Sequence, residues 1–379
     1  MPADAQLTPA AVALLDLLRR VAASDAFIFG HQDTDIEGQN FNDHYHLGGR
    51  GAGMPLHSDV IESTGGSLPG MSGFNLDWVA RGVHLNTDGF REAIAPLLKQ
   101  GVVIQLFWEA WNPVTNGDAR DTRHSPLTRI LPGGSANEKW VMWMDRIADF
   151  LHAVGLSTHS AAVFRPFHEC SGDWFWWGTS VSSPEEYVAA WRYTTSYLRG
   201  RGIHSLLYAY SPSKPTLSPA HWQIAYGTQQ STSRYPGDEE VDIVCFDAYH
   251  SDISFARDLT SDCARVSEFA VAHRKVAAIC EFGITDGLQR ERDPRWYMNS
   301  LLNPVLRSCP RIAFAHTWRN GAPDSYYVPL PRQTTYSGFL DFFRSQHTIF
   351  AGDPRLTATE PSPPSPPPRP RNPPPPPTP

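Results

Sequence analysis

Short runs of apolar and β-branched residues recur eight times along the chain, and each run ends in polar or aromatic residues before a loop. Helix-like stretches lie between these runs, for example at 90–101, 138–155 and 184–202. Near-continuous apolar strands that alternate with helices are typical of a parallel sheet covered on both faces. The predicted strands are 26–32, 70–78, 102–109, 161–169, 205–212, 241–249, 275–283 and 311–320.

Eight strand–helix units over roughly 320 residues predict an α/β fold, a (β/α)8 TIM barrel with insertions. An open doubly wound sheet has the same order of elements. However, no GxGxxG motif follows the first strand, so the dinucleotide-binding form of that sheet loses its main support. We expect one barrel domain over residues 1–355 and a disordered, Pro-rich tail or linker over 356–379.

The C-terminal end of the chain differs in composition from the rest. From Pro361 the sequence reads PSPPSPPPRPRNPPPPPTP, which is typical of a solvated polyproline II segment. Most such segments are spacers. The alternatives are an SH3 or WW ligand, a wall-type contact through SPP and SPPP repeats, or a linker to a further module.

The N-terminal segment reads MPADAQLTPAAVALLDLLRR and lacks a basic region before its apolar stretch. It therefore predicts an amphipathic helix rather than a signal peptide.

Composition narrows the classes of function. Hydrophobic residues make up 41% of the 379 residues and charged residues 19%, so the chain has enough apolar material for a large core. A net charge of −7 argues against a nucleic-acid-binding protein. No window approaches eighteen consecutive apolar residues, so we expect no membrane span.

The five cysteines show no CxxC or other metal-binding spacing. Their odd number leaves at least one thiol without an intramolecular partner, and their sparseness does not indicate a disulfide scaffold. Cys245 and Cys280 lie inside apolar runs and are therefore predicted to be buried thiols.

In barrels of this type the functional residues lie at the C-terminal ends of the strands. Glu169 ends the fourth predicted strand and Glu281 the seventh, so both would face one ligand across the barrel mouth. Two carboxylates about 5–5.5 Å apart are what a retaining glycosidase needs, one as the nucleophile and one as the acid/base. Few of the strand-end residues are histidines and none form an HxH pair, which disfavours a metal, and we expect no cofactor. The other strand-end candidates are His31, Asp77, Trp108, Glu109, His168, Ser211, Asp247, Tyr249 and Trp318.

Residues 164–178, FRPFHECSGDWFWWG, are too aromatic for an ordinary loop after a strand. Indole rings stack on the apolar faces of sugars, and their N–H groups donate to hydroxyls. The alternative is that the indoles fill the core at the barrel mouth. We expect one or two of Trp174, Trp176 and Trp177 to do so and the rest to touch substrate.

This segment resembles the signature of glycoside hydrolase family 26, whose β-mannanase-type members are retaining (β/α)8 enzymes. The resemblance spans about residues 25–345. The other matching segments are FGHQD at 29–33, SDVIESTGGSLPGMSGFNLDW at 58–78, WNP at 111–113, VDIVCFDAY at 241–249, EFG at 281–283 and HTWRN at 316–320.

The resemblance implies roles for individual residues. Glu169 is similar to the family's acid/base and Glu281 to its nucleophile, with Tyr249 as the tyrosine that hydrogen-bonds the nucleophile. Arg165 would orient a catalytic carboxylate and keep it ionised. The strand-end positions and the resemblance together give the candidate substrate-binding residues His31, Trp108, Glu109, Arg165, His168, Trp174, Asp247, Tyr249 and Trp318.

Glu109 departs from the family's pattern. Mannanases of the family carry a WHxxNP-like segment after the third strand, whereas this chain reads WEAWNP at 108–113. A third carboxylate in the mouth would raise the pKa of the acid/base by repulsion or accept hydrogen bonds from sugar hydroxyls. The alternative is that Glu109 pairs with an arginine such as Arg165.

The sequence therefore favours a retaining endo-glycosidase that hydrolyses β-1,4-mannosidic bonds in mannan, glucomannan or galactomannan by double displacement. The alternatives are a relative acting on β-1,3-xylan or β-glucan, and a silent carbohydrate-binding barrel, which would normally lack one of the two glutamates. The negative charge favours a neutral polysaccharide partner. We expect a monomer that binds no nucleic acid or membrane. Substrate class and tail favour an extracellular or secreted protein, although no signal peptide is visible.

Overall fold

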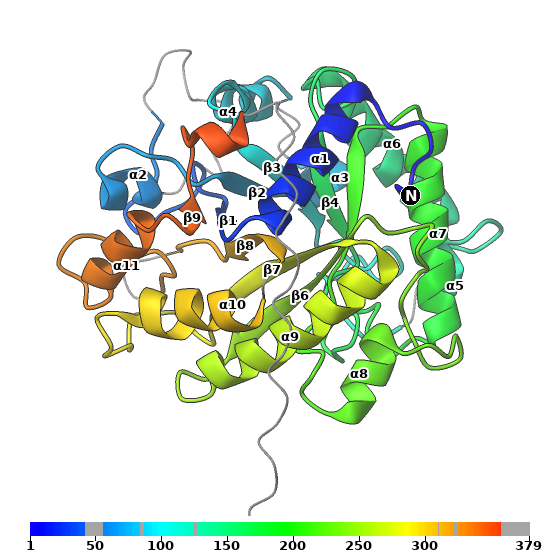
Figure 1. The fold of residues 1–379 in the computed structure, drawn as a ribbon. Helices are drawn as coiled ribbons and strands as arrows, with labels where there is room; N and C mark the ends of the chain where they lie inside the picture. The colour runs from blue at the N-terminus through cyan, green and yellow to red at the C-terminus, as the bar shows by residue number, and fades with distance from the viewer. Residues whose placement is uncertain (42–55, 84–86, 125–126, 310, 322–324, 358–379) are drawn as a thin grey trace, which may run out of the picture.

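The computed structural model describes residues 1–41, 56–83, 87–124, 127–309, 311–321 and 325–357. Eight parallel strands follow one another around a barrel, and pairing of β2 with β1 completes the ring (Figure 1). The predicted (β/α)8 fold is thereby confirmed. The strands are β1 (Phe27–Gln32), β2 (Met71–Asn75), β3 (Val103–Trp108), β4 (Ala162–Pro166), β5 (Leu206–Tyr210), β6 (Ile243–His250), β7 (Val276–Ile284) and β8 (Ile312–Thr317).

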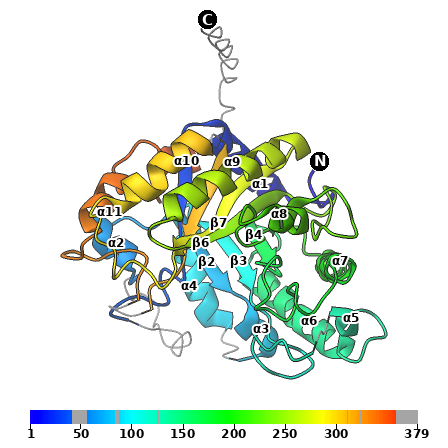
Figure 2. The same ribbon diagram turned by 90° about the horizontal axis from the view of Figure 1, so that it is seen from below.

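Helices surround this ring of strands (Figure 2). Those predicted at 90–101, 138–155 and 184–202 correspond to α4, α6 and α7. A capping box begins α7, where Ser183 and Glu186 exchange side-chain and backbone hydrogen bonds. The helices are α1 (Pro9–Ala23), α2 (Asp59–Thr64), α3 (Asp77–Arg81), α4 (Thr87–Lys99), α5 (Leu127–Ile130), α6 (Asn137–Ala153), α7 (Pro184–Gly200), α8 (Pro219–Tyr226), α9 (Phe255–His273), α10 (Asn303–Ser308) and α11 (Tyr336–Phe343), with a π-helix at Tyr297–Leu302.

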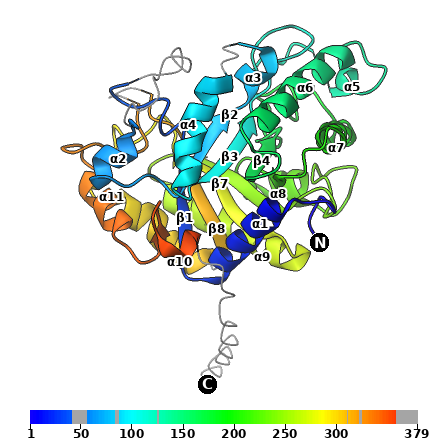
Figure 3. The same cartoon turned by 90° about the horizontal axis from the view of Figure 1, so that it is seen from above.

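The N-terminal helix α1 packs on the barrel next to β8 (Figure 3). Its apolar face, which includes Leu14 and Leu18, belongs to one buried cluster with strand residues such as Val163 and Leu207. This confirms the predicted amphipathic helix. Because the cluster consists of apolar residues, it excludes water from this part of the barrel.

The cysteines correct one prediction. Cys245 and Cys280 are buried as expected, but they form a disulfide rather than two thiols, and Cys263 and Cys309 form a second one. Barrel closure brings β6 beside β7 and places the Cα atoms of the first pair 5.7 Å apart. A sequence separation of 35 residues does not reveal such neighbours. Cys170 is the buried free cysteine that the odd number required.

The C-terminal end of the described fold packs on the barrel. A short strand, β9 (Thr348–Ile349), pairs with β1 and was not predicted. A 3₁₀ turn follows at Pro354–Leu356, and Leu356 is buried. The tail predicted over 356–379 lies outside the described residues from position 358 onward. No helix in the described part of the chain is long and apolar enough to span a bilayer.

We predict that a chain ending at Thr357 keeps the melting temperature of the full-length protein, because a polyproline sequence buries little surface. A chain ending at Ala351 should lose about 2 kcal/mol of unfolding free energy, since burial of Leu356 is lost. It also loses the hydrogen bond from Arg355 to the carbonyl oxygen of Gln346. Differential scanning calorimetry of the three chains measures this, and equal stability of the two truncated chains would contradict it.

Candidate active site

A cavity of about 290 Å³ lies at the C-terminal ends of the strands. Glu109 follows β3, Glu169 follows β4, and Glu281 comes from β7, so three carboxylates from different strands share its wall. The sequence-predicted residues that line it are Glu109, His168, Glu169, Trp174, Tyr249, Glu281 and Trp318.

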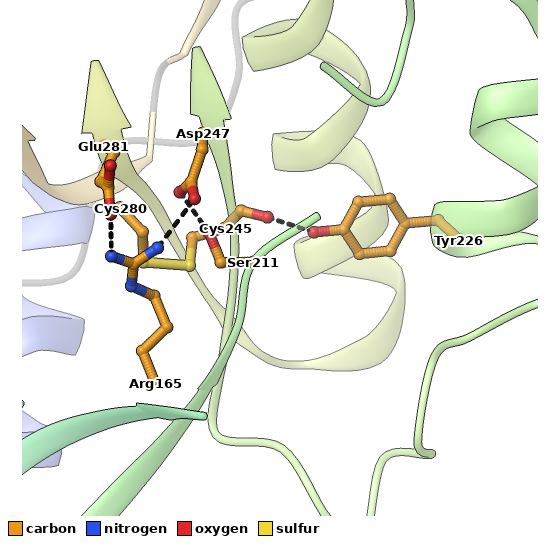
Figure 4. The surroundings of a disulfide bond; sticks show 7 residues. All are labelled: Arg165, Ser211, Tyr226, Cys245, Asp247, Cys280 and Glu281. Atoms are coloured by element: carbon orange, nitrogen blue, oxygen red, sulfur yellow. Dashed lines mark hydrogen bonds and ion pairs between the residues drawn. A yellow bond between two sulfur atoms is a disulfide. The ribbon is translucent and has the colours of Figure 1, made fainter. Parts of the chain in front are cut away.

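A fully buried arginine holds Glu281. Arg165 on β4 donates to Glu281 and, over 2.8 Å, to Oδ2 of Asp247 on β6 (Figure 4). Ser211 donates to the other carboxylate oxygen of Asp247, and Tyr249 donates to Oε2 of Glu281 over 2.8 Å. These contacts fix the direction in which Glu281 faces the cavity.

Arg165 and Asp247, which the sequence predicted as substrate-binding residues, do not line the cavity. Both side chains have 0% exposure because they lie in the barrel interior rather than at its mouth. Their position instead suits the orienting role that the resemblance implied for Arg165, since Arg165 contacts Glu281 directly.

Two further predicted substrate-binding residues also lie outside the cavity lining. Side chains alternate along β3, so Phe107 packs against Trp318 inside the barrel whereas Trp108 faces the helices. The Trp108 ring stacks on Trp140 of α6 at 4.3 Å. His31 is fully buried. The prediction that Trp108 and His31 contact substrate is thus not supported by their positions.

The backbone of the segment after β4 is unusual. Phe167 and Glu169 both adopt the left-handed conformation, with φ of 48° and 52°. Such residues cost on the order of 1–3 kcal/mol each and persist only where the surroundings hold them. Tyr187 donates to the carbonyl oxygen of Phe167 at 3.0 Å, and Trp177 donates to that of His168 at 2.7 Å. The Glu169 N–H donates to the carbonyl oxygen of Ser211 at 2.6 Å, so the turn presents the Glu169 side chain to the cavity.

The aromatic segment divides between core and cavity. Trp176 and Trp177 have 0% exposure, and the indole N–H of Trp176 donates to the carbonyl oxygen of Ala110 at 2.7 Å. Trp174 lines the cavity, and its N–H donates to Oε2 of Glu169 at 2.7 Å. Two of the three indoles therefore fill the core, within the range predicted from the sequence.

Burial, together with the charge of Glu281, raises the pKa of Glu169 to about 7. The Trp174 hydrogen bond and the positive charges of Arg165 and Arg120 oppose this rise. Burial and the charge of Arg165 also lower the pKa of His168 well below its usual value, so the imidazole next to Glu169 is neutral. Glu169 is thus a carboxyl group able to hold or release a proton near neutral pH.

Sequence reasoning missed five residues of the cavity wall. Arg120 lies in the loop between β3 and α5, and its guanidinium is 5.1 Å from the centre of the Phe175 ring. A charged loop residue carries no periodic signal, so nothing in the pattern set Arg120 apart from the arginines near it. Among the described residues, no group of three His, Cys, Asp or Glu side chains is placed to hold a metal ion. The missed residues are Arg120, Phe175, Thr285, Asp286 and Tyr327.

Comparison with known families agrees with this geometry. The sequence profile of Glycosyl hydrolase family 26 matches residues 85–292, more than half of the chain. The chain belongs to glycosyl hydrolase family 26.

Its relatives in the family include named mannanases. A mannan endo-1,4-beta-mannosidase of Bifidobacterium adolescentis is 29% identical over 71% of this chain and 28% of its own length. The chain therefore spans about a third or less of the length of the first curated relatives that it matches. A GH26 β-mannanase from Bacteroides ovatus has a TM-score of 0.80 at 31% identity, covering 93% of this chain and 98% of that one. For a modular endo-β-1,4-mannanase from Cellulomonas fimi the TM-score is 0.79 at 28% identity, covering 92% and 77%.

Within this family 26 site, Glu109 lines the cavity and does not pair with Arg165, whose partners are Asp247 and Glu281. The alternative in which it pairs with Arg165 is therefore wrong. Burial, followed by the charge of Glu281, raises the pKa of Glu109 to about 7, and Arg120 opposes the rise. The repulsion thus acts between Glu109 and Glu281, whereas the charge that raises the pKa of Glu169 is that of Glu281 and not, as expected from the sequence, that of Glu109.

We predict that Glu109→Gln changes the pH dependence of stability. A carboxyl group with a folded pKa of about 7 binds more protons when folded than when unfolded between its unfolded value, roughly 4.3, and 7. Stability from this group is therefore present at low pH and lost as pH rises through that window. The melting temperature of Glu109→Gln minus that of the wild type should increase from about pH 4 to about pH 8.

Differential scanning fluorimetry across this pH range measures the difference. Glu268→Gln, on the exposed side of α9, is the matched control and should give a flat difference. If the melting-temperature difference between Glu109→Gln and the wild type also stayed constant with pH, the carboxyl group of Glu109 would be solvated.

Proposed function

We propose that this family 26 barrel is a retaining endo-β-1,4-mannanase, with Glu281 as the nucleophile and Glu169 as the acid/base. The observation that carries the proposal is that two carboxyl groups share one cavity in different surroundings. Glu281 is held by an arginine and a tyrosine, whereas Glu169 is buried beside an indole. Carboxyl groups in unlike environments are how such enzymes separate the two roles.

Glu281 supplies the attacking oxygen in this mechanism. Arg165 and Tyr249 donate to its two oxygens and fix the plane of the carboxylate. Attack on the anomeric carbon forms a covalent glycosyl ester as the bond to the leaving oxygen breaks. A fixed carboxylate reduces the entropy lost in reaching the attack geometry.

Glu169 supplies the proton. With a pKa of about 7, it is protonated in mildly acidic solution and gives its proton to the leaving oxygen. Once ionised, it removes a proton from the water that hydrolyses the ester, which regenerates both groups. The Trp174 N–H bonded to Glu169 favours the ionised form, so it assists the second step.

The substrate proposed is a neutral β-1,4-mannan, glucomannan or galactomannan. Trp174 and Trp318 line the cavity with the flat apolar surfaces on which sugar rings stack. The named mannanase relatives support mannan, while Glu109 at the cavity wall favours β-1,3-xylan or β-glucan as the second candidate, because family mannanases carry a histidine there.

The proposal extends to the setting in which the protein works. Two disulfides in one chain are typical of an oxidising compartment, which supports an extracellular protein. The oligomeric state proposed is a monomer. The Pro-rich residues from Pro361 onward would then be a spacer or a contact to wall material or to a further module.

The test of function is a reducing-sugar assay on glucomannan, galactomannan, mixed-linkage glucan, β-1,3-xylan and cellulose. We expect the highest kcat/KM on the mannans and loss of turnover in Glu281→Ala, because no glycosyl ester forms. Azide should restore some hydrolysis to Glu281→Gly, with inversion at the anomeric carbon. Glu268→Ala is the matched control. Near-wild-type activity of Glu281→Ala would refute the assignment, and preference for another glycan would move the substrate to that class.

Glu169→Ala should lose activity by about 100-fold or more on polysaccharide but much less on aryl glycosides, whose leaving group hardly needs a proton. In the wild type, the alkaline limb of kcat/KM should fall near pH 7, where Glu169 ionises in the free enzyme. Parallel kinetics on a mannan and on an aryl β-mannoside measure both effects. Equal losses on the two substrates would show that Glu169 does not act as the acid.

A further inference from the structure

The disulfide between Cys245 and Cys280 lies next to the carboxylates of the site (Figure 4). Cys280 directly precedes Glu281 on β7, and Cys245 lies two residues before Asp247 on β6. Both cysteines have 0% exposure and belong to the apolar cluster shared with α1. The bond therefore joins the two strands that present the partners of Arg165.

The pairing of these strands changes register at this bond. Residue by residue, Cys245 lies opposite Ala278, and the next residue of each strand is also paired. The following pair, however, is Asp247 with Glu281, so Cys280 has no partner residue on β6. Cys280 is thus the extra residue of a β-bulge, a feature that redirects side chains beside active sites.

This bulge determines where Glu281 points. In an unbroken register Glu281 would lie opposite Ala248. The Ala248 side chain belongs to the buried apolar cluster that packs the outer face of the strands against the helices. A shift of one residue moves a side chain to the other face of a strand. With the bulge, Glu281 lies opposite Asp247, and one guanidinium reaches both carboxylates.

We propose that the Cys245–Cys280 disulfide is a positioning element of the active site: it fixes the bulge in β7 and thereby aims Glu281 into the cavity. The inference rests on the proposed role of Glu281. The bulge residue has no opposing residue to hold it, and the sulfur–sulfur bond supplies that restraint. Tyr226 of α8 adds to it, since its hydroxyl donates to the carbonyl oxygen of Cys245.

The second disulfide offers a matched control. Cys263 on α9 joins Cys309, the residue that caps α10, with Cα atoms 5.1 Å apart. This bond links two helices and lies outside the cavity lining. Its removal should cost stability without moving a catalytic group.

The first measurement is the thiol count. Alkylation of the denatured wild type without reductant should label one cysteine, Cys170. Peptide mapping identifies the labelled residues, and labelling of Cys245 and Cys280 would overturn the proposal, because the bond between them would then be absent.

The second measurement compares two variant pairs, Cys245→Ala/Cys280→Ala and Cys263→Ala/Cys309→Ala. We expect kcat of the first pair to fall by roughly 10- to 100-fold with a smaller change in KM, because a displacement of about 1 Å has such an effect. Its alkaline pH limb should move to lower pH, since Glu281 lies farther from Glu169 and repels it less. The control pair should lose melting temperature but keep its kcat within about twofold and its pH profile.

Equal kcat and equal pH profiles in the two pairs would overturn the proposal. If the alanine pair does not fold, Cys245→Val/Cys280→Ala returns apolar volume to the cluster and tests the same point. A crystal structure of the variant gives a readout that needs no turnover: Glu281 should lose its contacts with Arg165 and Tyr249. Unchanged contacts would refute the inference, whereas an inactive wild type would refute only the proposed function.

Discussion

A positive charge enclosed in the barrel is the constraint on which the rest of the site depends. Arg165 has 0% exposure, and burying an ion costs on the order of several kcal/mol unless it is paired. Asp247 and Glu281 supply that pairing from β6 and β7, and Ser211 and Tyr249 donate to their remaining oxygens. Four strands or strand ends are thereby fixed relative to one guanidinium.

The placement of this charge separates the two carboxyl groups of the cavity. Glu281 is bonded to Arg165, whereas Glu169 receives only the Trp174 N–H among its described side-chain contacts and has a pKa of about 7. The neutral His168 adds no positive charge that would lower it. One guanidinium thus yields two carboxyl groups of unlike character in one cavity, which the proposed double displacement requires.

The tryptophans connect the walls of the cavity as well as line it. Trp176 donates to the carbonyl oxygen of Ala110, the neighbour of Glu109, and Trp177 donates to that of His168, the neighbour of Glu169. Buried indole N–H groups need such partners. The same two hydrogen bonds therefore hold the indoles in the core and fix the backbone beside Glu109 and Glu169.

The sequence by itself determined the order of strands and helices, because buried parallel strands read as apolar runs and their ends carry the chemistry. It thereby identified Glu169 and Glu281 as candidates, and the cavity brings both together. Only the tertiary structure decided that Trp108 faces the helices and that Cys280 bonds to Cys245 across a bulge. The reason is that the face a strand residue takes and its neighbour across the sheet depend on register and barrel closure. Both are set by contacts between residues far apart in the chain.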